Sequence, residues 1–135
     1  MSKVSGGCVC GEVRYECDPA GAFAFECHCR DCQHVSGGAY VPVVYLSKSA
    51  FAFTHGEPRY YSTESLAGGR NRRGFCAECG SRLTGGETAD SIGIAAGSLD
   101  DPSLFKPVLA MHVADAQPWD RLDPAMPKFD RYPPA

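Results

Sequence analysis

The sequence predicts an all-β protein built from small sheets, and three observations lead to this prediction. The runs of β-branched and aromatic residues are short, and they are bounded by Gly, Pro or Asp. Turn signals recur about every eight to twelve residues, as in compact all-β folds. Fifteen glycines and ten prolines among 135 residues leave little room for long helices, so we expect only one helical turn, after Cys29.

The first expected strand covers residues 12–17, where alternation places Val13, Tyr15 and Cys17 on one face. The other expected strands cover residues 22–26, 39–46, 51–54, 59–62, 72–76, 82–84, 91–96 and 108–113. Pro42 cannot donate a backbone hydrogen bond, which predicts an edge or bulged strand for residues 39–46. Residues 55–58 predict a hairpin turn, and from Gln117 onwards we expect an irregular surface tail.

Length, charge and hydropathy limit the classes of function. A chain of 135 residues without a linker or an internal repeat predicts a single domain over residues 1–135. The formal net charge is −3, which argues against a nucleic-acid-binding surface. No apolar stretch is long enough to predict a membrane span, and no secretory signal precedes the first cysteine. We therefore expect a cytoplasmic protein that binds neither nucleic acid nor membrane; the sequence leaves its oligomeric state open.

Seven of the eight cysteines fall into three clusters, and their spacing predicts metal binding. In the cytosol, clustered thiols bind metal more often than they form disulfides. Cysteines two or three positions apart also rarely meet disulfide geometry, although an oxidised scaffold remains the competing interpretation. The clusters are Cys8-x-Cys10, Cys27-x-Cys29-x-x-Cys32 and Cys76-x-x-Cys79.

The outer two clusters together predict a structural zinc site. Cys76 and Cys79 resemble a zinc knuckle, because Gly80 permits the left-handed backbone that such a turn requires. A structural zinc takes four ligands, and Cys8 and Cys10 supply the missing pair. Zinc bound by these two distant pairs would stabilise a small domain whose hydrophobic core alone contributes little stability.

The middle cluster predicts a second zinc site of a different kind. Cys27, Cys29 and Cys32 offer three thiolates, and no further clustered cysteine remains to close the site. Three protein ligands with one open position are typical of catalytic zinc. Two alternatives stay open: the knuckle pairs with two of these three thiolates, or His28 or His34 completes the middle site.

The remaining candidates have simpler interpretations. Cys17 is expected to be a buried, metal-free thiol on the face of Val13 and Tyr15. His28 is expected to point away from the metal, and His34 to be a polar neighbour of the site. His55 and His112 are interpreted as a solvated turn residue and a structural residue. The basic run Arg70, Arg72 and Arg73 is interpreted as surface charge that also offsets the negative charge of the thiolates. Residues 36–38 are interpreted as a glycine loop near the second site.

These motifs, in this order and spacing, resemble the glutathione-dependent formaldehyde-activating enzyme family, which includes centromere protein V-type domains. The shared positions are Gly7-Cys8-x-Cys10-Gly11 with Val13, Arg14 and Tyr15; Cys27-His28-Cys29-x-x-Cys32 with Gly37; Phe75-Cys76-x-x-Cys79-Gly80-Ser81; Gly97-Ser98-Leu99-Asp100-Asp101-Pro102; and His112 with Pro118-Trp119. The resemblance implies a β-tent fold of small antiparallel sheets braced by zinc. It also implies a structural zinc at the outer clusters and a more labile zinc at the middle one.

The activity that the resemblance implies is a carbon–sulfur lyase reaction, in which the thiol of glutathione adds to formaldehyde to give S-hydroxymethylglutathione. Its partners would then be a small thiol and an aldehyde, and Cys27, Cys29 and Cys32 would be the catalytic residues. Two other functions remain: a non-catalytic zinc module for protein interaction, and a thiol-based redox or zinc-handling protein.

Overall fold

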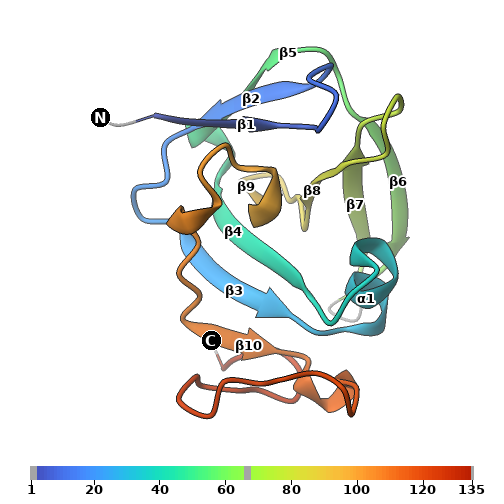
Figure 1. Ribbon diagram of the computed structural model, residues 1–135, viewed down its shortest axis with the longest axis vertical. Helices are drawn as coiled ribbons and strands as arrows, with labels where there is room; N and C mark the ends of the chain where they lie inside the picture. The colour runs from blue at the N-terminus through green and yellow to red at the C-terminus, as the bar shows by residue number, and fades with distance from the viewer. Residues whose placement is uncertain (1–2, 66–67, 135) are drawn as a thin grey trace.

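The computed structural model describes residues 3–65 and 68–134, and it confirms the all-β class. The three-stranded sheet has the order β1-β2-β5, and the seven-stranded sheet has the order β10-β3-β4-β9-β8-β7-β6 (Figure 1). The strands are β1 (Val4–Gly7), β2 (Arg14–Cys17), β3 (Phe23–Cys27), β4 (Val41–Ser47), β5 (Phe51–His55), β6 (Arg59–Glu64), β7 (Arg70–Phe75), β8 (Arg82–Gly85), β9 (Ser91–Ala95) and β10 (Leu109–Met111).

The helix predicted after Cys29 is confirmed as α1 (Arg30–Ser36), the one α-helix in the described part of the chain. Short 3₁₀ turns occupy Lys48–Ala50, Ala96–Ser98, Pro102–Leu104 and Val113–Asp115. Strand pairs are antiparallel except β10 with β3, which run parallel. Among the described residues, no helix combines the length and the hydropathy that a membrane crossing requires.

Strand β1 was missed by the sequence analysis, because Ser5, Gly6 and Gly7 have low β-propensity. Its glycines are required by packing instead. A Cβ atom on Gly6 would collide with the hydroxyl of Tyr15 and with the carbonyl of Ser98. The strand therefore lies close to the core, since it carries no side chain at this position.

Two predictions about strand pairing were wrong. The hairpin predicted at residues 55–58 does not form, because β5 pairs with β2 whereas β6 pairs with β7 in the other sheet. Gly56 has a φ of 67° and packs against the carbonyl of Glu12, so the chain crosses between the sheets at this point. Pro42 does not mark an edge strand, because β4 lies between β3 and β9; the ladder with β9 begins only at Val43, beyond the proline.

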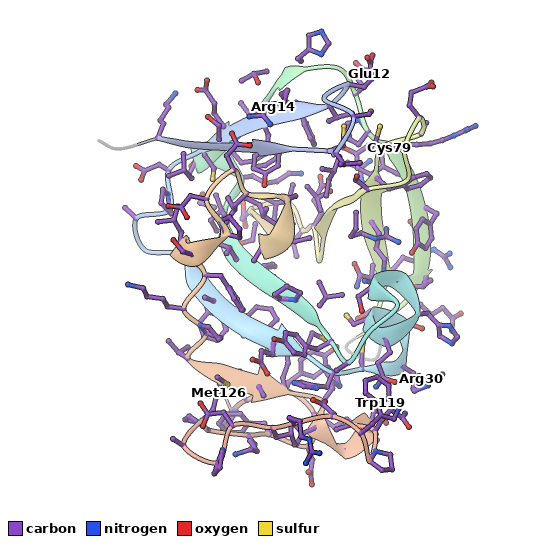
Figure 2. All side chains as sticks on the ribbon, viewed as in Figure 1. Glu12, Arg14, Arg30, Cys79, Trp119 and Met126 are labelled. Atoms are coloured by element: carbon purple, nitrogen blue, oxygen red, sulfur yellow. The ribbon has the colours of Figure 1, made fainter. Side chains whose placement is uncertain are left out.

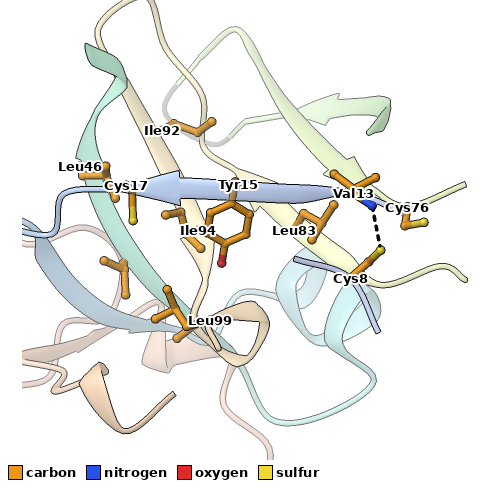
Figure 3. Packing of buried hydrophobic residues seen from close by; sticks show 12 residues of the cluster. Cys8, Val13, Tyr15, Cys17, Leu46, Cys76, Leu83, Ile92, Ile94 and Leu99 are labelled. Atoms are coloured by element: carbon orange, nitrogen blue, oxygen red, sulfur yellow. Dashed lines mark hydrogen bonds between the residues drawn. The ribbon is translucent and has the colours of Figure 1, made fainter. Parts of the chain in front are cut away.

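The main core lies between the two sheets, and the predicted face of β2 forms its centre (Figure 3). Val13, Tyr15 and Cys17 are all buried, which confirms the alternation inferred from the sequence. The Tyr15 hydroxyl lies 2.6 Å from the hydroxyl of Ser98, so this buried polar atom has a partner. Leu83 and Ile94 pack against the same core from β8 and β9.

The chain after Gln117 has no regular helix or strand among its described residues, as predicted. It still pairs with the large sheet, because Phe129 donates a backbone hydrogen bond of 3.0 Å to Ala110 in β10. Figure 1 shows this tail alongside β10. The tail therefore supports β10 and, through it, the end of β3 that carries the middle cysteine cluster.

Candidate metal centres

The outer cysteines meet in one cluster, as the sequence predicted. The Sγ atoms of Cys8, Cys10, Cys76 and Cys79 all lie within 4.8 Å of one another. Cys8 Sγ is 3.6 Å from Cys10 Sγ, which is 3.7 Å from Cys76 Sγ. Four sulfurs at a Zn–S distance of about 2.3 Å stand about 3.8 Å apart in a tetrahedron. The four-thiol cluster therefore has dimensions that fit one zinc ion.

Two similar turns build the four-thiol cluster. Gly11 donates a backbone hydrogen bond of 3.1 Å to the Cys8 carbonyl, and Gly80 donates one of 2.8 Å to the Cys76 carbonyl. Both glycines have positive φ angles, 82° and 78°, which a residue with a Cβ rarely adopts. The Ser81 hydroxyl, 3.1 Å from Cys79 Sγ, lowers the pKa of Cys79 to about 6. The Ser81 contact stabilises the thiolate of Cys79, and the thiolate is the form that binds zinc.

The middle cysteines form a separate cluster where β3 ends and α1 begins. Cys27, Cys29 and Cys32 lie within 4.8 Å of one another, and Cys27 Sγ is 3.6 Å from Cys29 Sγ. Cys29 is the N-cap of α1, and its sulfur accepts a 3.4 Å hydrogen bond from the backbone N–H of Cys32. Hydrogen bonds from Cys27 and Cys32 lower the pKa of Cys29, and the contacts of Cys27 with Cys29 and Cys32 raise the pKa of Cys27.

Cys17 lies in neither cluster, and the eight cysteines are all free thiols. Desolvation in the core raises the pKa of the Cys17 thiol, which keeps it in the neutral form. The oxidised scaffold and the pairing of the knuckle with the middle cysteines are both absent from the described structure.

Neither candidate histidine completes the three-thiol cluster. His28 is fully buried, and its two ring nitrogens contact carboxylates: Nδ1 lies 2.7 Å from Asp120 Oδ2 and Nε2 lies 3.0 Å from Glu26 Oε1. His34 is exposed on α1, with Nε2 3.4 Å from an Arg30 nitrogen. In the described part of the chain, the three thiols therefore have no fourth His, Cys, Asp or Glu ligand atom within the same distance.

Arg73 lies beside the three-thiol cluster, and the sequence analysis placed it wrongly on the surface. Its side chain is only 5% exposed, and Nη1 is 3.8 Å from Cys32 Sγ. Alternation along β7 exposes Arg70 and Arg72 but directs Arg73 to the opposite face of the strand. The alternation of side chains along a strand, applied to residues 70–73, would have predicted that Arg73 faces away from Arg70 and Arg72.

The three-thiol cluster opens onto a cavity of about 750 Å³, whose floor is one face of the seven-stranded sheet. His112 also lines this cavity; it is buried, and its Nδ1 has no hydrogen-bond partner among the described residues. The ring of Tyr132 holds it edge-on at 4.5 Å between centroids. Residues 36–38 do not line the cavity; Gly37 instead caps the C-terminus of α1.

The two clusters lie in different parts of the fold. Figure 2 shows Cys79 near the closed end of the β1–β2 hairpin, whereas Arg30, which starts α1, lies toward the tail. Cys8 and Cys76 of the four-thiol cluster belong to the main core, but the three-thiol cluster borders the cavity. A metal at the first cluster would have its four positions filled by thiols, although Cys10 is exposed, whereas a metal at the second would keep one position open beside the cavity.

Comparisons with known proteins give one family and one similar fold. A sequence profile of the glutathione-dependent formaldehyde-activating enzyme family matches residues 3–115, which include both clusters and His112 but not the Pro118-Trp119 pair. No curated protein matches the sequence. A crystal structure of a Rhodobacter sphaeroides protein is similar in fold, with a TM-score of 0.59 and 20% sequence identity, and the similarity covers 76% of this chain and 96% of the other.

Proposed function

The chain belongs to the glutathione-dependent formaldehyde-activating enzyme family, and on that premise we propose that it is a zinc-dependent carbon–sulfur lyase. The proposed reaction joins the sulfur of glutathione to the carbon of formaldehyde, while the thiol proton passes to the aldehyde oxygen. The observation that best supports it is the three-thiol cluster, open to a cavity of about 750 Å³.

Cys27, Cys29 and Cys32 are the residues that would hold the catalytic zinc. Bound there, zinc would polarise the carbonyl oxygen or lower the pKa of a coordinated thiol. Arg73 places a fixed positive charge 3.8 Å from Cys32 and so favours the thiolate form of the cluster. His112 lines the cavity, and its Nδ1 has no hydrogen-bond partner among the described residues, so this side chain would hydrogen-bond to the thiol or to the aldehyde oxygen.

The four-thiol cluster has a separate role in this proposal. Cys8, Cys10, Cys76 and Cys79 would hold a structural zinc that ties the turn after β1 to the turn after β7. All four positions of a tetrahedral ion are then taken by protein, so no substrate can bind it. We propose that this zinc makes residues 1–135 a single zinc-binding domain.

The open cluster favours an enzyme over an interaction module, because a module would use a closed second site or none. The redox interpretation requires two thiols close enough to bridge, and Cys27 and Cys29 are 3.6 Å apart. That separation also matches two ligands of one zinc ion, so it does not favour the redox function over the enzyme. Catalysis must therefore be tested directly.

The test is exchange spectroscopy, which follows glutathione, formaldehyde and their adduct at equilibrium. Zinc-replete protein should accelerate interconversion, Cys29→Ser should not, and Cys17→Ala should behave as wild type because Cys17 lies outside both clusters. No acceleration by the wild-type protein, with two zinc ions bound, would exclude the formaldehyde reaction.

A further inference from the structure

The cavity floor has an apolar side and a cationic side. Phe25, Val43 and Tyr45 form the apolar side from β3 and β4. Between the two sides, β9 packs so closely at Gly93 that a Cβ there would lie 2.9 Å from the Gly85 carbonyl and 3.0 Å from Val43 Cγ1. The cavity of about 750 Å³ over this floor leaves room for an extended molecule across the sheet.

Two arginines form the cationic side. Arg73 on β7 pairs with Tyr61 on β6, and the Tyr61 hydroxyl accepts a hydrogen bond from Arg82 on β8, so the two arginines meet at the same side of the cavity. Arg73 Nε, Arg82 Nε and Arg82 Nη1 are buried and have no hydrogen-bond partner among the described residues. Arg82 Nη2 donates a 2.7 Å hydrogen bond to the Tyr61 hydroxyl, which fixes one end of its guanidinium.

Buried guanidinium nitrogens without partners are costly, which indicates that a ligand supplies the missing acceptors. The planar fork of arginine matches a carboxylate in a bidentate arrangement. Acidic residues that line the cavity do not supply these acceptors. Glu87 pairs with Lys48 and Arg72, Asp115 lies 3.6 Å from Arg131, and Asp31 and Glu64 are exposed.

We propose that Arg82, supported by Arg73, binds a carboxylate of the thiol substrate and so determines its specificity. This inference rests on the proposed function, because that function places the sulfur of the substrate at the three-thiol cluster. Arg73 contacts Cys32, and Arg82 lies on the next strand opposite Phe75, an offset from Arg73 of roughly 7 Å along the strand and about 5 Å across it. The substrate is therefore an extended thiol whose carboxylate is several bonds from its sulfur.

The experiment measures binding without any reaction. S-methylglutathione and its diethyl ester are titrated into the zinc-loaded protein by isothermal calorimetry, with no formaldehyde present. Wild-type protein should bind the acid about tenfold more tightly than the ester, as expected for a charge-assisted pair. In Arg82→Gln the ratio of the ester and acid dissociation constants should fall to about one. Arg121 is an exposed tail residue outside the cavity, so Arg121→Gln should keep the wild-type ratio.

Arg82→Lys provides a second variant that keeps the charge but loses the fork, and it should retain only part of the preference. Circular dichroism and zinc content establish that each variant is folded. Equal binding of acid and ester by the wild type, no binding of either, or an unchanged preference in folded Arg82→Gln would overturn the inference. Failure of the formaldehyde exchange assay alone would not, because these titrations contain no aldehyde.

Discussion

The two cysteine clusters offer the same thiol chemistry in different surroundings. In the four-thiol cluster, Cys8 and Cys76 are buried in the main core, Cys10 is exposed, and each pair lies on a turn closed by a glycine. In the three-thiol cluster, the sulfurs lie at a strand–helix junction beside a cavity. The difference predicts that the number of thiols and the neighbouring cavity, rather than the type of ligand, would separate a stabilising metal site from a reactive one.

The largest expected effect is on folding, at the four-thiol cluster. Cys76→Ser should lose the structural zinc, whose binding contributes about 10 kcal/mol or more to the stability of comparable sites. Cys76 is fully buried, so the serine hydroxyl would also lack solvation. We expect an unfolded or aggregated protein, measured by circular dichroism and by zinc content. Full zinc content with an unchanged melting temperature would contradict the structural role.

The next effect is on activity, at the three-thiol cluster. Cys29→Ser should lose the second zinc and the exchange activity but keep the fold. Cys29 is the N-cap of α1, and serine is equally good at this position, so the helix should persist. Zinc analysis should give one ion per chain where the wild type has two. Unfolding of Cys29→Ser would show that both clusters are structural and would remove the contrast between them.

The sequence predicted which cysteines lie together better than it predicted their surroundings. Thiols two or three positions apart on a turn lie close to one another, and the structure brings the two outer pairs into one cluster as expected. Strand pairing depends on distant segments, so β5 was given the wrong partner. His28 illustrates the same limit: its partner Asp120 is 92 residues away, and no local pattern connects them.

The third prediction concerns the support of the three-thiol cluster by the tail. Asp120 contacts buried His28, which separates Cys27 from Cys29, yet Asp120 lies beyond the residues that the family profile matches. Asp120→Ala should leave a ring nitrogen of His28 unsatisfied and lower the free energy of unfolding by about 2 kcal/mol. Chemical denaturation would measure this loss, with Asp130→Ala, an exposed tail residue, as the control.

The second zinc should also exchange faster in Asp120→Ala than in the wild type, because its ligands lose their support, whereas the first zinc should be unaffected. A colorimetric chelator would separate the two populations. If both zinc ions exchange at wild-type rates, the tail contributes only to global stability and not to the geometry of the three-thiol cluster.

The smallest effect is expected at Cys17, which tests whether burial alone explains a thiol outside the clusters. Its side chain is 2% exposed among apolar neighbours, and burial raises its pKa, so it has no thiolate to offer a metal. Cys17→Ala removes one sulfur from the core and should cost about 1 kcal/mol of stability by denaturation. Zinc content and exchange activity should match the wild type, because neither cluster includes this residue. Loss of a zinc ion in this variant would show that metal binding depends on Cys17, and would contradict its assignment as a metal-free core thiol.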